Sequence, residues 1–296
     1  MKIVKRWTDE EIELLKSEYS VNPNIYSRFP DRSYQSITFK AWELGLKAKG
    51  RGCKLFDVNY FDQLDENSAY VLGFIAADGN VHRNVLTITQ SDRKVLEVIA
   101  SDMGFDEPYP ISPTTTGGFN LQMRNQHLVD RLAGYGICER KSLILGKIKV
   151  PDNILRDFTR GVIDGDGSVC VYPDNRRNSY MFDISIMGSY NFLHWLQAAI
   201  SRITGMPHRK VTDTKSNAKR IHYSGMNAVL LHVWCYGNNP SLYFERKRKK
   251  LDEYISIYPD RITYSYNTPC PGSKYILLQQ SNASGVALLG DDIVQG

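Results

Sequence analysis

The chain reads SAYVLGFIAADGNV from Ser68 to Val81 and DFTRGVIDGDGSV from Asp157 to Val169. Both stretches have an apolar run, a glycine five residues before an aspartate, and then Asp-Gly followed by a β-prone segment. After each come an alternating strand pattern, an amphipathic helix pattern, further strand-like sequence and another helix pattern. Each copy ends on Glu-Arg-Lys, at residues 139–141 and 245–247. The parallel covers about ninety residues per copy and indicates an internal repeat.

The repeat predicts an α+β fold of tandem αββαββα units related by a pseudo-twofold axis, preceded by a small three-helix domain. We expect the helical domain at residues 1–50, a linker at 51–67, the first repeat at 68–147 and the second at 148–258. Residues 259–296 show no periodicity and are assigned to a C-terminal tail of unknown role.

Composition excludes several classes of protein. The 296 residues are 42% hydrophobic and 23% charged, which is typical of a globular protein and not of a disordered one. No apolar stretch reaches the roughly eighteen residues of a membrane span, and the start MKIVKRWTDEE lacks the apolar segment of a signal peptide. The five cysteines stand singly, which argues against a disulfide framework or a cysteine zinc site. We therefore expect an intracellular location, in a bacterium, a phage-infected cell or an organelle.

The positive charge of the chain is concentrated in two regions. The formal net charge is +5, but residues 205–250 alone carry ten basic and two acidic residues. Residues 1–54 carry eleven basic and seven acidic residues. Binding to phosphates through counterion release explains both regions, although an ordinary solvated surface explains either one taken alone.

The repeated Asp-Gly suggests a metal site. Gly73 and Gly161 would let two helices approach closely, so that both helix ends emerge together with Asp78 and Asp166 at equivalent points. Two carboxylates so close repel each other unless a cation lies between them, and hard oxygen ligands favour Mg²⁺. Such a pair can act on a phosphodiester. The alternative is that Asp-Gly only ends each helix, and the duplication argues against it.

The segments LGFIAADG and GVIDGDG, each at the head of a repeat, resemble the two motifs of a single-chain LAGLIDADG homing endonuclease over about residues 65–258. The resemblance implies two antiparallel sheets that form a saddle along the DNA major groove, with the motif helices as the core between the repeats. It implies that Asp78 and Asp166 bind metal, with the backbone carbonyls of Ala77 and Gly165 as further ligands. Ala76 departs from the motif, which usually has an aspartate there; we do not interpret this departure as inactivating.

Other catalytic positions follow from the same resemblance. Gln90 resembles the polar residue that orders active-site water, and because Gly188 stands at the matching place the two half-sites are expected to be unequal. Lys141 and Lys247, in the two Glu-Arg-Lys triplets, resemble the basic residue that stabilises developing phosphate charge. Their alternative role is that of a cation at a helix end.

Strand alternation predicts the residues that face DNA. Leu86 and Ile88 would point inward, as would Ile184 and Ile186. The outward positions of these strands are Val85, Thr87, Thr89, Asp183, Ser185 and Met187. Further candidates on adjoining strands are Arg83, Gln122, Arg124, Arg176, Arg177, Lys219, Arg220 and His222.

The N-terminal segment resembles the SANT/Myb-like helix-turn-helix type. Thr8 and Glu11 form a capping-box pattern, and ITFKAWELGL has an apolar face of Ile37, Ala41 and Leu44. Trp7 is expected in the core. The resemblance puts one helix in a DNA groove, with Arg32, Ser33, Gln35, Ser36 and Lys40 nearest the DNA.

These observations predict a monomeric, site-specific homing endonuclease that makes a Mg²⁺-dependent double-strand break in a long, asymmetric double-stranded DNA target. Tandem repeats in one chain make a homodimer unnecessary. Two alternatives keep the same fold: an RNA-splicing maturase that binds intron RNA, and a catalytically inactive DNA-binding regulator. The presence of both Asp78 and Asp166 favours cleavage over either alternative.

Overall fold

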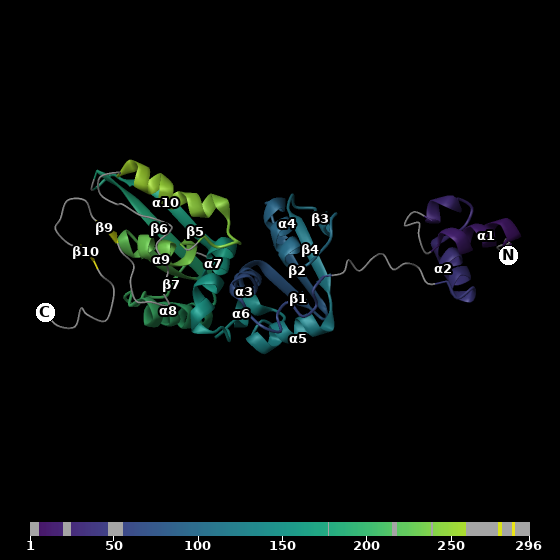
Figure 1. Cartoon of the computed structure of the whole chain (residues 1–296), viewed down its shortest axis with the longest axis horizontal. Coiled ribbons are helices and arrows are strands. Elements are labelled where there is room, and N and C mark those ends of the chain that lie inside the picture. Colours follow the sequence, from purple (N-terminus) through teal and green to yellow (C-terminus); the bar gives the residue numbers. More distant parts are fainter. Residues whose placement is uncertain are drawn as a thin grey trace. The chain divides into compact units, whose positions relative to one another are not determined.

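The computed structural model describes residues 6–19, 25–46, 56–176, 178–214, 218–237 and 239–258, together with the short antiparallel strands β9 (Leu278–Gln279) and β10 (Val286–Ala287) (Figure 1). The chain divides into two compact units, Met1–Leu55 and Phe56–Gly296. Among the described residues, no helix combines the length and the apolar character that crossing a membrane requires.

The N-terminal unit contains α1 (Asp9–Glu18), a 3₁₀ turn η1 (Ile25–Arg28) and α2 (Tyr34–Glu43). The capping box is present: Thr8 Oγ1 accepts from the amide of Glu11, and the Glu11 side chain accepts from the amide of Thr8. A small core contains Leu15, Ile25, Phe29, Ile37 and Ala41. The second of the three predicted helices is thus a single 3₁₀ turn.

The second unit contains the two predicted repeats. The first runs α3 (Glu66–Asp78), β1 (Gly79–His82), β2 (Val85–Gln90), α4 (Arg93–Asp102), β3 (Ile111–Pro113), β4 (Phe119–Arg124), α5 (Gln126–Tyr135) and α6 (Lys141–Ile144). The second runs η2 (Asp152–Ile154), α7 (Leu155–Asp166), β5 (Gly167–Asp174), β6 (Ser179–Gly188), α8 (Tyr190–Thr204), β7 (Thr212–Asp213), β8 (Lys219–Ser224), α9 (Met226–Tyr236) and α10 (Glu245–Ile257). The tandem α+β fold class is confirmed.

Each repeat forms one four-stranded antiparallel sheet. The strand orders are β1-β2-β4-β3 and β5-β6-β8-β7, so the two sheets have the same topology. Ile88 pairs with Leu121 in the first sheet, and Ile186 pairs with Ile221 at the equivalent place in the second. All four side chains are buried. One face of each sheet therefore belongs to the core, as the alternation predicts.

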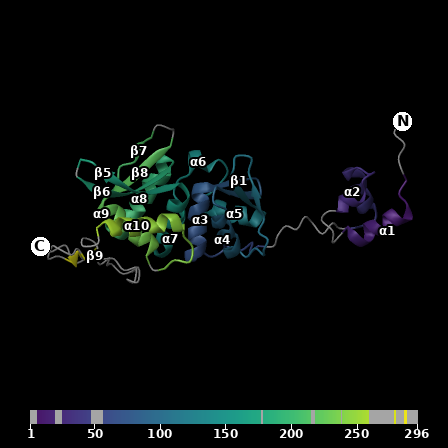
Figure 2. The same cartoon turned by 90° about the horizontal axis from the view of Figure 1, so that it is seen from above.

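The motif helices α3 and α7 lie side by side at the junction of the repeats (Figures 1 and 2). Their approach depends on two glycines. A Cβ at Gly73 would lie 2.0 Å from the backbone oxygen of Phe158, and a Cβ at Gly161 would lie 2.0 Å from that of Tyr70. Any side chain there would push the helices apart, so the predicted close packing between the repeats is confirmed.

The start of the second unit differs from the predicted linker at 51–67. Phe61 is fully buried, and Phe56 stacks on Phe105 with ring centroids 5.0 Å apart. The Tyr60 hydroxyl donates to Asp102 on α4. Residues 56–65 therefore pack onto the first repeat because they carry three aromatic rings whose burial stabilises the fold.

Candidate active site and nucleic-acid face

The carboxylates of Asp78 and Asp166 stand at the ends of the two motif helices, where each is the last helical residue. A Cβ built on Gly165 of α7 would lie 3.2 Å from Oδ2 of Asp78, so the Asp78 side chain contacts the end of the neighbouring helix. Burial, together with the negative charge of Asp166, raises the pKa of Asp78 to about 6. Burial also raises the pKa of Asp166. The fold thus brings together the two acids that the sequence singles out.

Gln90, at the end of β2, makes the two halves of this site unequal. Its Nε2 donates to Oδ2 of Asp78 over 2.5 Å, so it holds the carboxylate directly. The matching residue in the second repeat, Gly188, offers no side chain. A Cβ there would lie 3.1 Å from a ring carbon of Phe192, so the space is already crowded.

Lys141 and Lys247 bind the carbonyl ends of the motif helices. Lys141 Nζ donates to the carbonyls of Ala76 (2.7 Å) and Ala77 (2.6 Å). Lys247 Nζ donates to the carbonyls of Ile163 (2.6 Å), Asp164 (2.7 Å) and Gly167 (2.8 Å). Burial lowers the pKa of both lysines, that of Lys247 to about 8. Each lysine neutralises a helix C-terminus, the alternative role that sequence analysis leaves open.

The donor set fits a hard divalent cation. Two neighbouring carboxylates whose charges repel each other gain from a cation between them, and carboxylate and carbonyl oxygens are the ligands that Mg²⁺ prefers. The carbonyl of Ala77 already accepts from Lys141, and that of Gly165 lies 3.4 Å from Lys247 Nζ. Each carbonyl has a second lone pair for a further ligand. Within the described ranges, no cluster of three or more histidine, cysteine, aspartate or glutamate side chains could hold a metal.

Asp164, the acid of the second motif whose counterpart is Ala76, has a structural role. It is fully buried and accepts from Tyr236 Oη (2.6 Å), the Phe244 amide (2.7 Å) and Tyr70 Oη (3.0 Å). It therefore anchors both ends of the connection from α9 to α10. These contacts give Asp164 a structural role in the second repeat.

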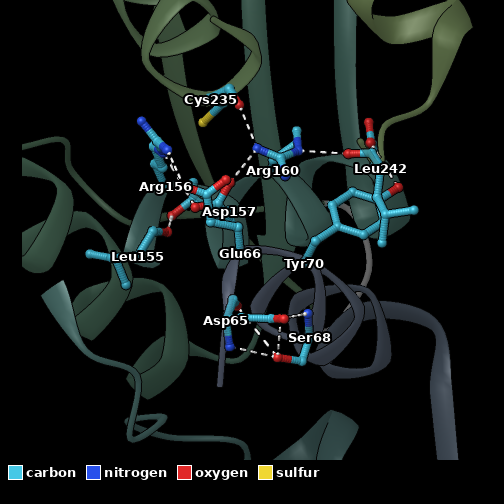
Figure 3. A network of polar contacts seen from close by, with 12 residues as sticks. Asp65, Glu66, Ser68, Tyr70, Leu155, Arg156, Asp157, Arg160, Cys235 and Leu242 are labelled. Carbon is cyan, nitrogen blue, oxygen red and sulfur yellow. Dashed lines mark hydrogen bonds and ion pairs between the residues drawn. The ribbon is translucent and has the colours of Figure 1, made fainter. Parts of the chain in front are cut away.

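Arg160 supports the same connection, as Figure 3 shows. Its Nε donates to the carbonyl of Leu242 (2.8 Å), and its Nη1 donates to Asp157 (2.7 Å) and to the carbonyl of Cys235 (2.9 Å). The guanidinium lies over the Tyr70 ring of α3. The α9–α10 connection leads to the first turn of α10, which carries Lys247. Sequence analysis did not identify Arg160, although an arginine within an apolar helix was a detectable signal.

The outward faces of both sheets carry most of the predicted DNA contacts. On the first sheet, Thr89 Oγ1 donates to Asn120 (2.7 Å) and Gln122 Nε2 donates to Thr87 Oγ1 (3.3 Å). The outward residues that sequence analysis predicts correctly are Val85, Thr87, Thr89, Gln122, Arg124, Ser185, Met187, Arg220 and His222. The outward residues that it missed include Asn80, His82, Asn120, Ser168, Cys170 and Tyr172, all visible from the same alternation.

Other predicted contacts lie elsewhere. Arg83 and Arg176 are in the turns before β2 and β6 rather than on a strand face. Lys219 lies on the same side of β8 as buried Ile221 and forms an ion pair with Asp213. Arg177 lies outside the described residues. Asp183 is on the outward side but is buried, because its carboxylate accepts from two neighbouring side chains.

In the N-terminal unit, the Arg32 side chain packs against other residues of the unit. Its side chain is only 3% exposed, bonds to Glu11 through Nε (2.8 Å) and Nη2 (2.5 Å), and lies 3.9 Å from the centre of the Trp7 ring. Trp7 also contacts Phe29, as expected of a core residue.

The other predicted contacts of this unit lie on or beside α2. Ser33 caps α2 by accepting from the amide of Ser36, and Lys40 pairs with Glu43. The side chain of Gln35 lies outside the described part of the chain. Sequence analysis missed the exposed aromatic pair Phe39 and Trp42 on α2.

Comparison with known proteins gives limited similarity. No family model matches the chain. The uncharacterized protein Lin2408 of Listeria innocua is 49% identical over 43 residues, which are 14% of this chain and 57% of that protein. The match therefore spans little more than half of that relative.

Several solved structures resemble part of this chain in their backbone fold. They include the LAGLIDADG meganuclease I-AabMI bound to uncleaved DNA, with a TM-score of 0.46, 12% identity, and coverage of 66% of this chain and 91% of that one. The homing endonuclease I-WcaI bound to its DNA recognition sequence has a TM-score of 0.45 and 14% identity, with 65% and 90% covered. The full-length DUF199/WhiA of Thermatoga maritima has a TM-score of 0.41 and 12% identity, with 68% and 64% covered.

Proposed function

We propose that this chain is a site-specific homing endonuclease that makes a metal-dependent double-strand break in a long, asymmetric DNA target. One observation carries the proposal: Asp78 and Asp166 converge at the paired ends of two motif helices, where burial and mutual repulsion favour a bound cation. Burial also raises the pKa of Asp164 and Asp157, but these two acids accept hydrogen bonds from Tyr236 and Arg160 respectively. A pair of incompletely compensated carboxylates fits a cation site better than a structural role.

The site residues have different roles in the proposed reaction. Asp78 and Asp166 would hold Mg²⁺, which when bound polarises a phosphodiester and lowers the pKa of water. Gln90 keeps the Asp78 carboxylate oriented. Lys141 and Lys247 neutralise the two helix ends, so that the backbone dipoles there do not add negative potential beside a phosphate.

The two repeats supply two different half-sites in one chain. The outward face of the first sheet presents Thr87, Thr89, Gln122 and Arg124, whereas that of the second presents Ser185, Met187, Arg220 and His222. Different side chains read different bases, so the target is expected to be asymmetric. The chain is expected to act as a monomer on double-stranded DNA, and the N-terminal unit is expected to extend the footprint.

The test is cleavage of a duplex library. The full chain is incubated with random duplexes in Mg²⁺, and the cut ends are sequenced. Asp78→Asn and Asp166→Asn should each abolish double-strand cleavage and leave binding largely intact, because each removes a metal ligand and little contact surface. Glu97→Gln is the matched control, since Glu97 is only partly buried on α4 and pairs with Arg93 in the described structure. Normal cleavage by either aspartate variant would refute the metal assignment.

A DNA-binding protein without nuclease activity is the second candidate. It is favoured by the lysines, which already occupy the carbonyl ends of both motif helices. Selective binding of a duplex by the wild-type chain, with no cut in Mg²⁺ or Mn²⁺, would support it and refute the endonuclease.

A further inference from the structure

The outward face of the second sheet carries a three-residue network with no counterpart in the first sheet. Asp183 of β6 accepts from the hydroxyl of Tyr172 on β5 (2.5 Å) and from Nε2 of His222 on β8 (3.0 Å), both through Oδ2. Asp183 pairs in register with Cys170 and Ser224, so Tyr172 and His222 reach it diagonally from the two neighbouring strands. One buried acid thus holds two surface side chains.

Stability alone does not explain why an aspartate is buried at position 183. Its side chain is 11% exposed, and its second oxygen, Oδ1, is buried without a hydrogen-bond partner in the described part of the chain. Burying an unpaired carboxylate oxygen destabilises a fold. The equivalent residue of the first sheet is Val85, which shows that an apolar side chain fits this place. The acid therefore serves something other than packing.

Its effect on His222 is to select one tautomer. A carboxylate only accepts hydrogen bonds, so Nε2 of His222 carries the proton. In the neutral ring, Nδ1 is then an acceptor. The His222 side chain is 43% exposed, so the ring remains accessible at the outward face. Phosphate oxygens are also acceptors, so Nδ1 of the neutral ring does not hydrogen-bond to the DNA backbone.

We infer that Asp183 is a positioning residue that makes His222 a reader of exocyclic amino groups, so that the second half-site selects adenine or cytosine at one position. This inference rests on the proposed binding of DNA along the sheet faces. In the major groove, adenine N6 and cytosine N4 present N–H donors, whereas guanine and thymine present acceptors. The acceptor Nδ1 matches only the first pair.

The first sheet offers a matched comparison. Gln122 occupies the place of His222 and donates to Thr87 Oγ1 over 3.3 Å. An amide carries both donors and an acceptor, so its base preference does not depend on an acidic partner. Removing Asp183 should therefore change base preference in the half-site of the second sheet, and removing the Thr87 hydroxyl should change it in the half-site of the first.

The experiment measures base preference by binding in EDTA at pH 8, so that absence of cleavage, which would refute the endonuclease, leaves the preference measurable. Duplexes selected by the wild-type chain are varied one position at a time. At one position of one half-site, adenine or cytosine should bind roughly tenfold more tightly than guanine or thymine. Asp183→Val should reduce this ratio to about twofold or less and leave the other positions unchanged. The control Thr87→Val should change preference only in the other half-site.

A second readout is independent of DNA. Nitrogen NMR of the imidazoles in the full chain should show His222 as the Nε2–H tautomer, and Asp183→Val should yield a mixture of tautomers. A wild-type preference for guanine or thymine at the His222 position, an unchanged profile in Asp183→Val, no base preference at all, or an unchanged tautomer would each overturn the inference.

Discussion

The Asp78→Asn variant tests the site through the stability of the protein as well as through its activity. The pKa of Asp78 rises from 3.8 to about 6 because the carboxylate is half-buried beside Asp166. A carboxyl group whose pKa rises on folding favours the folded state only while it is protonated. The free energy of unfolding therefore falls as the pH increases from about 4 to about 6. Above that range the loss reaches up to about 3 kcal/mol. Asp78→Asn removes the charge but keeps an oxygen that can accept from Gln90.

In EDTA at pH 8, Asp78→Asn should therefore unfold at a temperature roughly 6–12 °C higher than the wild type. The difference should shrink as the pH falls and vanish at about pH 3 and below, where the wild-type carboxyl is protonated in both the folded and the unfolded state. Mg²⁺ should raise the melting temperature of the wild type at pH 8 and have little effect on the variant. A variant that is no more stable than wild type at pH 8 would refute the reasoning on buried charge. Equal stabilisation of both proteins by Mg²⁺ would refute the metal site.

Lys247→Ala should slow single-turnover cleavage by roughly 10²-fold and lower stability; lost stability with an unchanged rate would leave Lys247 only a helix-end cation. Gly161→Ala should destabilise the second unit by about 3 kcal/mol in urea unfolding, because the added Cβ would lie 2.0 Å from a backbone oxygen of α3; Gly134→Ala, which meets nothing within 4 Å, is the control. Burial lowers the pKa of His232 from 6.5 to about 4, so wild type should lose about 3 kcal/mol between those pH values as the unfolded chain takes up a proton. His232→Gln should lose correspondingly less, and equal pH dependence would contradict this. Deletion of residues 1–55 should leave a folded nuclease with the same cut position, weaker binding and a shallower salt dependence; an identical footprint and salt slope would exclude DNA binding by that unit.

Sequence periodicity predicts the features that depend on neighbouring residues along the chain. The alternation that puts Leu86 and Ile88 inward and Thr87 outward follows from the two-residue period of a strand, and the structure agrees. The close approach of α3 and α7 was predictable from Gly73 and Gly161 because the motif occurs twice. Duplication itself carries long-range information, since two copies that bury the same face can pack on each other.

Tertiary structure alone decides which polar groups from distant segments meet. Arg32 is a basic residue of the type that binds DNA phosphates, but its side chain packs against Glu11 and Trp7. Asp183 has an outward position but is held by Tyr172 and His222 from two other strands. These outcomes depend on which side chains other segments present, and no local pattern records that.

Lys141 and Lys247 show most clearly what the sequence predicts and what only the packing decides. The repeated Glu-Arg-Lys marks Lys141 and Lys247 as equivalent, yet only packing shows that each ammonium group binds the carbonyls of a helix that ends 63 or 81 residues earlier in the chain. The sequence by itself determined the repeat, the two sheets and the pair of acids, because backbone geometry and duplication determine them. The tertiary structure decided the distant partners of buried charges such as Lys141, Asp164 and Lys247, because burial makes an unpaired charge unstable and their partners come from distant segments.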